Sequence, residues 1–161
     1  MKTIRQSCVS LHIISIALLF CSILFFASCE FHSGSSRQLK KEVDSFAVYY
    51  FNWQFHQARR FVTPSSEKWM RYAASQVHQA DIELLQQKEV PATCEIHEIT
   101  YSDDDSTAVA HVTIHYFLHM DTIGKAASIV NAARFDIPLK YEAKKDKWIV
   151  EVDGLMREVR T

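Results

Sequence analysis

Three histidines spaced by four, His111, His115 and His119, are the residues whose types most resemble a metal site. On a helix this spacing places the side chains on one face, where they can share a zinc ion. The residues from Ala110 to Tyr116 alternate between apolar and polar instead, which is typical of a strand. At about 3.3 Å per residue, a strand separates His111 from His115 by roughly 13 Å, too far for one zinc. The triple therefore does not predict a metal site.

A closer histidine pair depends on how this strand pairs with the strand before it. If the hairpin turn centres on Asp104, His97 lies opposite His111. We interpret this pair as a polar cross-strand contact on the less buried face, with metal binding as the alternative. No metal ligand and no cofactor are predicted. The same register keeps two apolar pairs together, Cys94 with Ile114 and Ile96 with Val112.

Cys94 would be a nucleophile only beside a base that lowered its pKa. Its place on a strand face with Ile96 favours a small core space instead. The aspartates at 103–105 lack the spaced oxygens, the glycine and the distant glutamate of a calcium loop. They indicate a solvated turn, since aspartate bonds its own backbone.

The elements that position these residues begin with a helix over residues 39–61, where apolar side chains recur at three and four positions. Core packing accounts for most of its aromatic residues, and the lining of a pocket or a contact with a partner is the alternative. Those aromatic residues are Phe46, Tyr49, Tyr50, Phe51, Trp53 and Phe55.

A second helical stretch follows, with Thr63 as its N-cap and Pro64 at its first position. It runs to about Lys88, because Pro91 forbids continuation. Residues 74–76 offer a weak place to bend, so the stretch is either one helix or two.

Four strands come after Pro91. The first has Cys94, Ile96, Glu98 and Thr100 on one face, and the second, over 108–119, turns its even-numbered residues inward. The third strand contains Pro138, which places it at an edge or a bulge. The fourth carries Trp148, Val150 and Val152 on one face, after a charged turn. Helices first and strands last predict an α+β domain, with N-terminal helices packed on a curved antiparallel sheet of about four strands.

The N-terminus resembles the signal of a bacterial lipoprotein. Lys2 and Arg5 precede an apolar run over 9–26, which leads into Phe26-Ala27-Ser28-Cys29. We expect residues 1–28 to be a signal peptide, 29–37 a flexible tether and 38–161 a single domain, with the lipid on Cys29. An uncleaved membrane anchor and ordinary secretory cleavage near Ala27 are the alternatives. All three place the domain outside the cytoplasm.

Removal of residues 1–28, which hold two basic residues and no acidic ones, leaves 16 of the 18 basic residues against 19 acidic residues. A negative chain lacks the basic footprint that nucleic acids require, so we expect no nucleic-acid partner. Cys8 and Cys21 leave with the signal and Cys29 is acylated. Cys94 then remains as the thiol of the domain, which excludes an intrachain disulfide.

Two segments carry a family resemblance: FHQARRFVTPS at 55–65 and KDKWIV at 145–150. With the order of elements, they look like the nuclear-transport-factor-two-like (cystatin-like) cone, in particular the small lipoproteins of unknown function in Bacteroides-type bacteria. The resemblance implies a curved sheet wrapped around helices, with an open end that can hold a ligand, and a homodimer through the sheet. Enzymes of this superfamily place Asp, Tyr or His inside the cone, and no motif transfers such a residue here.

We therefore expect a noncatalytic domain of the cell envelope, lipid-anchored to a bacterial membrane, with the outer membrane or cell surface as its place. It would bind a small apolar ligand or a partner protein. The alternative is an isomerase- or dehydratase-like enzyme, for which Tyr50, His56, Tyr116 and Asp136 are the residues to test.

Overall fold

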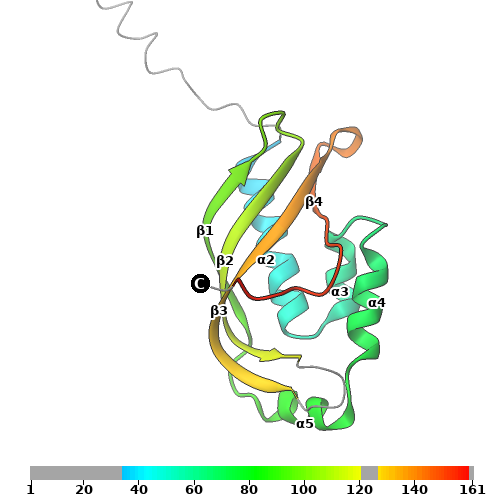
Figure 1. The fold of residues 1–161 in the computed structure, drawn as a ribbon, viewed down its shortest axis with the longest axis vertical. Coiled ribbons are helices and arrows are strands. Elements are labelled where there is room, and N and C mark those ends of the chain that lie inside the picture. The colour runs from blue at the N-terminus through cyan, green and yellow to red at the C-terminus, as the bar shows by residue number, and fades with distance from the viewer. Residues whose placement is uncertain (1–33, 121–126, 160–161) are drawn as a thin grey trace, which may run out of the picture. The chain divides into compact units, whose positions relative to one another are not determined.

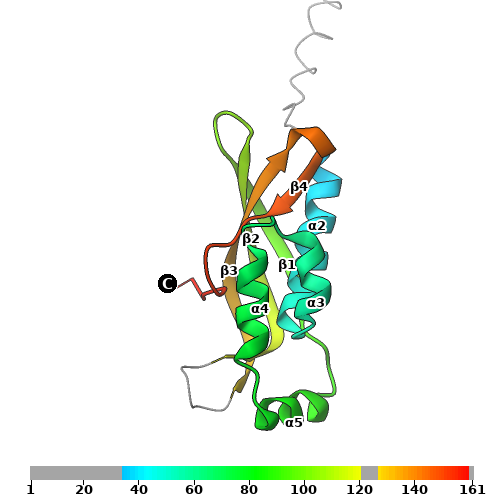
Figure 2. The same cartoon turned by 90° about the vertical axis from the view of Figure 1, so that its right-hand side faces the viewer.

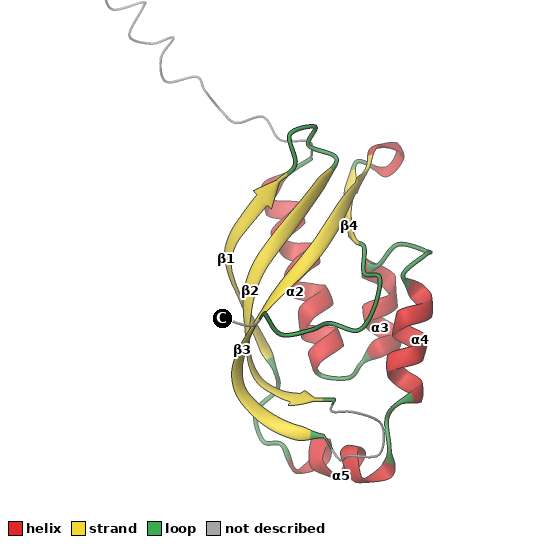
Figure 3. Ribbon diagram, viewed as in Figure 1, coloured by secondary structure: helices red, strands yellow, loops and turns green. Residues whose placement is uncertain are grey.

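A computed structural model describes residues 34–120 and 127–159 of the chain. Its helical part comes first, and the strands follow in one antiparallel sheet of order β1-β2-β3-β4. The sheet curves around α2, with α3 and α4 beside that helix and α5 at one end (Figure 1, Figure 3). The predicted α+β fold, with helices on a curved four-stranded antiparallel sheet, is confirmed. The elements are α2 (Ser36–Phe51), α3 (Phe55–Ala58), η1 (Arg59–Phe61), α4 (Glu67–Ser75), α5 (Gln79–Gln87), β1 (Thr93–Tyr101), β2 (Thr107–His119), β3 (Ser128–Glu142), η2 (Ala143–Lys145) and β4 (Lys147–Val150).

Helix α2 buries an apolar stripe against β1, β2 and β4. It ends at Phe51, so the prediction of one helix over 39–61 is wrong. Trp53 adopts a left-handed backbone with φ 59°, and its indole N–H donates to the Leu118 carbonyl at 3.2 Å. If the helix continued through Trp53, the indole could not form this hydrogen bond with β2. The buried residues of α2 are Leu39, Val43, Phe46, Ala47, Tyr50 and Phe51.

The second helical stretch is two helices, α4 and α5, which lie in different directions (Figure 2). Thr63 is not the N-cap of α4, because the helix begins only at Glu67. The Thr63 hydroxyl instead lies 2.8 Å from the Ser66 hydroxyl. Ser66 donates to the Val152 carbonyl at 2.8 Å and accepts the Val152 N–H at 2.9 Å. The Thr63 hydroxyl, which was expected to cap the helix, therefore contacts Ser66 instead, and Ser66 joins the start of α4 to the chain after β4.

Strand β1 pairs with β2 in the predicted register as far as Ile96, which lies opposite Val112. A bulge then occurs at His97, so that Glu98 lies opposite His111. The predicted His97–His111 pair is therefore wrong. The extra residue reverses the alternation, and Ile99 becomes partly buried against the core.

The inward face of β2 follows the prediction from Ala108 to Ile114 and then changes. Tyr116 has φ 54° and is 49% exposed, whereas Phe117 is buried. The expectation that every even-numbered residue faces inward is wrong at Tyr116, whereas the next even-numbered residue, Leu118, is buried beside Phe117. This change of direction brings Phe117 to the core.

Strand β3 is not an edge strand, since it lies between β2 and β4. Pro138 is tolerated because its carbonyl accepts the Glu151 N–H at 2.9 Å, on the β4 side. The nitrogen and carbonyl of one strand residue point to the same side, so the missing N–H costs no bond to β2. Regular β4 pairing ends one residue away, at Leu139 and Val150.

Candidate functional site

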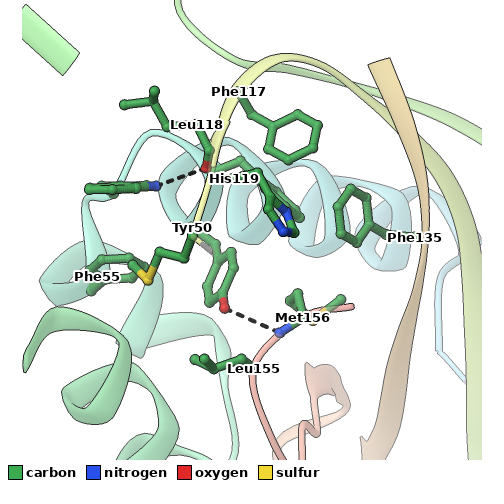
Figure 4. A pocket seen from close by; sticks show the side chains of 11 residues that line it. Tyr50, Phe55, Phe117, Leu118, His119, Phe135, Leu155 and Met156 are labelled. Atoms are coloured by element: carbon green, nitrogen blue, oxygen red, sulfur yellow. Dashed lines mark hydrogen bonds between the residues drawn. The ribbon is translucent and has the colours of Figure 1, made fainter. Parts of the chain in front are cut away.

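An apolar pocket lies where the end of α2 meets the end of β2, the middle of β3 and the chain after β4 (Figure 4). We call it the mouth pocket. Its volume of about 50 Å³ has room for one or two water molecules, well below the roughly 300 Å³ at which ligand pockets begin. Its lining residues are Tyr50, Phe51, Trp53, Phe55, Phe117, Leu118, His119, Met120, Phe135, Leu155 and Met156.

Three aromatic rings in mutual contact form the floor of the mouth pocket. Phe51 of α2 lies 4.6 Å from Phe135 of β3 and 5.3 Å from Phe117 of β2, between ring centroids. Phe117 and Phe135 are 5.4 Å apart. Edge-to-face and tilted rings at these distances attract one another beyond the effect of burial alone. The floor is therefore apolar and closely packed.

Tyr50 is the hydroxyl-bearing side chain of the pocket, and its oxygen accepts the Met156 N–H at 3.2 Å (Figure 4). Burial raises the pKa of Tyr50 to about 12, although the hydrogen bond from Met156 acts in the opposite direction. Tyr50 therefore stays protonated at neutral pH. It does not have the pKa of a general base or acid at that pH.

The other polar groups of the pocket have partners. His119 Nδ1 lies 3.4 Å from Glu158 Oε1, at the rim. The indole N–H of Trp53 donates to the Leu118 carbonyl. The pocket thus offers an incoming molecule a mainly apolar surface with one imidazole at its edge.

Of the residues proposed for an enzyme, only Tyr50 lines the mouth pocket. His56 and Tyr116 are exposed. Asp136 lies 2.7 Å from His111 Nδ1, on the sheet face turned away from the helices. Sequence reasoning missed Phe117, whose inward position depends on the φ of Tyr116.

The outer face of the sheet carries polar contacts of His97 and His115. His97 Nε2 lies 2.7 Å from the Thr113 hydroxyl, and His115 Nε2 lies 3.2 Å from Glu95 Oε2. Over residues 34–120 and 127–159, no three His, Cys, Asp or Glu side chains are placed to share a metal ion.

Cys94 is half-buried on the inner face of β1, as its alternation with Ile96 predicted. Burial, together with the charge of Asp44, raises the pKa of the thiol to about 12. A thiol with this pKa is protonated at neutral pH and is a poor nucleophile. The geometry supports the interpretation that Cys94 fills space.

The turn predicted at 102–106 is confirmed, and Asp104 holds it together. Its Oδ1 accepts the Ser102 hydroxyl at 2.7 Å and the Ser106 N–H at 3.1 Å. The carboxylate is therefore engaged by the turn itself.

Residues 1–33, which include Cys29, lie outside the described residues. The structure therefore does not test the predicted signal peptide or the predicted acylation site. In the part of the chain that is described, no helix has both the length and the apolar composition needed to cross a bilayer.

The chain matches no family model and no curated protein. Solved structures that match include the intermembrane-space region of the chloroplast protein ARC6, at 13% identity. The match covers 78% of this chain and 98% of that one, with a TM-score of 0.42. A likeness this distant carries no argument about function. The fold and the pocket define the class as a small α+β domain with an apolar pocket.

Proposed function

We propose that this chain is a noncatalytic, lipid-anchored domain of the bacterial cell envelope. At the mouth pocket it binds an apolar group, which belongs either to a small ligand or to a partner protein. The observation that carries the binding role is the lining. It is aromatic and aliphatic, and Tyr50 within it has a pKa raised to about 12. Apolar pockets with few polar groups are typical of binding sites.

The anchor is supported by the sequence around Cys29 and by the resemblance to envelope lipoproteins with a nuclear-transport-factor-two-like cone. An isomerase- or dehydratase-like enzyme receives less support. Of the residues considered for such an enzyme, Tyr50 is the one that lines the pocket, and its raised pKa of about 12 is far from that of a general acid or base at neutral pH.

The binding role is tested with an environment-sensitive apolar fluorophore and the substitution Met120→Asp. Met120 lines the pocket and is partly exposed, so the substitution places a carboxylate at the pocket without removing a core residue. We expect affinity for the fluorophore to fall at least about tenfold, because an apolar probe does not solvate the charge.

The matched control is Ile82→Asp, which adds the same charge to an exposed position of α5. It should leave the affinity unchanged. A parent chain that binds no fluorophore, or equal losses in the two variants, would contradict the proposed binding role.

A further inference from the structure

The chain after β4 returns to β3 (Figure 1, red), and two of its residues line the mouth pocket. We call residues 154–159 the strap. Leu155 and Met156 form part of the pocket lining, and Figure 4 shows Met156 beside the Tyr50 hydroxyl and Leu155 below the Tyr50 ring. The strap therefore covers the pocket with two large apolar side chains.

Three kinds of contact hold the strap. Its main chain forms an antiparallel bridge between Glu158 and Phe135 of β3, and the Val159 N–H donates to the Arg134 carbonyl at 2.9 Å. The Met156 N–H donates to Tyr50. These are the contacts of a peptide that adds to the edge of a sheet, where backbone bonds give affinity and side-chain pockets give specificity.

The third contact is electrostatic. Glu158 Oε1 lies 3.4 Å from His119 Nδ1, and both side chains are 39% exposed. A carboxylate on the strap thus meets the imidazole at the pocket rim. The side chain of Arg157, between Met156 and Glu158, is exposed.

The strap is held more loosely than the elements around it. It has no helical or strand pairing beyond the single bridge, and Val159 is 41% exposed. A Cβ built on Gly154 meets nothing within 4 Å, so the chain has open space where the strap begins. Segments with few buried contacts open at lower free energy than the core.

We propose that the strap is a self-ligand, and that the site beneath it binds an extended peptide of a partner protein. The peptide would carry two adjacent bulky apolar residues and a carboxylate two positions after the second, as Leu155, Met156 and Glu158 do. This inference rests on the proposed binding role of the mouth pocket and names its partner. In the resting chain Leu155 and Met156 line the pocket, whose volume is about 50 Å³.

The test is a titration of a labelled peptide, DGLMREV, which copies residues 153–159. It is added to the full chain and to the double variant Leu155→Ser/Met156→Ser, whose strap has lost its apolar side chains. We expect the double variant to bind the peptide at least about tenfold more tightly than the parent, because the tethered strap competes at high effective concentration. The peptide with its methionine replaced by serine should bind at least about tenfold more weakly.

The matched control is Arg157→Ala, which changes an exposed strap side chain and should bind the peptide as the parent does. A double variant that retains the parent's circular dichroism and binds no peptide would overturn the proposal. The proposal would also be overturned if the parent forms a dimer, the double variant does not, and neither binds the peptide. That result would assign the site to a second copy of the chain.

Hydrogen exchange of the unaltered parent keeps the inference testable if the double variant unfolds. The amides of Met156 and Val159 should exchange faster than those of central β3, and excess peptide should accelerate them further. Strap amides as protected as the β3 core would refute the inference. Fluorophore binding without peptide binding would support the proposed binding role of the pocket and contradict only the proposal that the strap is a self-ligand.

Discussion

Asp81 is a buried carboxylate, 3% exposed, that joins α5 to the start of β3. It accepts the Ala127 N–H at 2.8 Å and the His78 N–H at 2.9 Å, and His78 Nδ1 lies 3.4 Å away. Burial by itself raises the pKa of Asp81, but these hydrogen bonds and the nearby imidazole outweigh it. The pKa therefore lies below its ordinary value. The ionised form thus stabilises the folded state.

Asp81→Asn tests this at the scale of one residue. The pKa of Asp81 in the folded state is below the unfolded-state value of about 3.9. The ionised carboxylate therefore contributes its full stabilisation above about pH 3.9, and this contribution is lost as the pH falls through the folded-state pKa. At pH 7 we expect Asn to cost about 1–2 kcal/mol of unfolding free energy. Between about pH 5 and pH 3 the variant should lose less stability than the parent. Urea unfolding at both pH values measures this.

Asp103→Asn is the control. Asp103 is exposed in the turn after β1, and its side chain forms no hydrogen bond or ion pair with the described residues. It should follow the parent's pH dependence. Equal losses by the parent and Asp81→Asn between pH 5 and pH 3 would show that the carboxylate is not the stabilising group.

Residues whose environment is local were predictable from the sequence. Asp104 accepts hydrogen bonds from residues of its own turn, and Cys94 follows the alternation of its own strand. The exposure of Tyr116 was not predictable, because its orientation depends on its own left-handed backbone conformation. Such features are set by tertiary packing, which overrides local pattern.

At the scale of elements, the break after α2 is fixed by Asn52. Its amide nitrogen donates to the Val48 carbonyl at 2.8 Å and to the Ala92 carbonyl at 3.0 Å, and its oxygen accepts the Ala92 N–H at 2.8 Å. One side chain thus ties the end of α2 to the residue that precedes β1, and Ala92 is buried.

Asn52→Ala should lower the unfolding free energy by about 2–3 kcal/mol, because it leaves both backbone groups of the buried Ala92 without these partners. Urea unfolding monitored by circular dichroism measures the change. Gln86→Ala removes a comparable amide from the exposed face of α5 and should cost less than about 0.5 kcal/mol. Similar effects of the two substitutions would refute the role of Asn52.

The bulge in β1 shows why element boundaries were only partly predictable. The register before His97 follows from matching apolar faces. The bulge then turns Tyr101 inward, where its ring contacts Trp148 edge-to-face at 5.7 Å between centroids. Because Trp148 belongs to β4, far along the chain, no local pattern around His97 reveals this contact.

At the scale of the whole described domain, the two ends of α2 have different neighbours. Gly34 precedes the helix with φ +73°, and a Cβ there would lie 3.0 Å from the rings of Trp148 and Tyr141. The mouth pocket lies at the other end of α2, whose 16 residues span about 24 Å. The mouth pocket thus lies at the end of the described domain remote from Gly34.

The substitution Cys29→Ala tests the proposed lipid anchor. The sulfur of Cys29 is the proposed acceptor of the acyl chains, so we expect the variant to lose labelling by a radioactive fatty acid in a bacterial host. The domain should also leave the membrane fraction, because acyl chains supply the affinity for the bilayer. Cys94→Ala is the control, since this thiol lies on the inner face of β1 and should keep both labelling and membrane association. Equal labelling of Cys29→Ala and the parent would contradict the lipid anchor, while the apolar pocket would remain testable with the fluorophore.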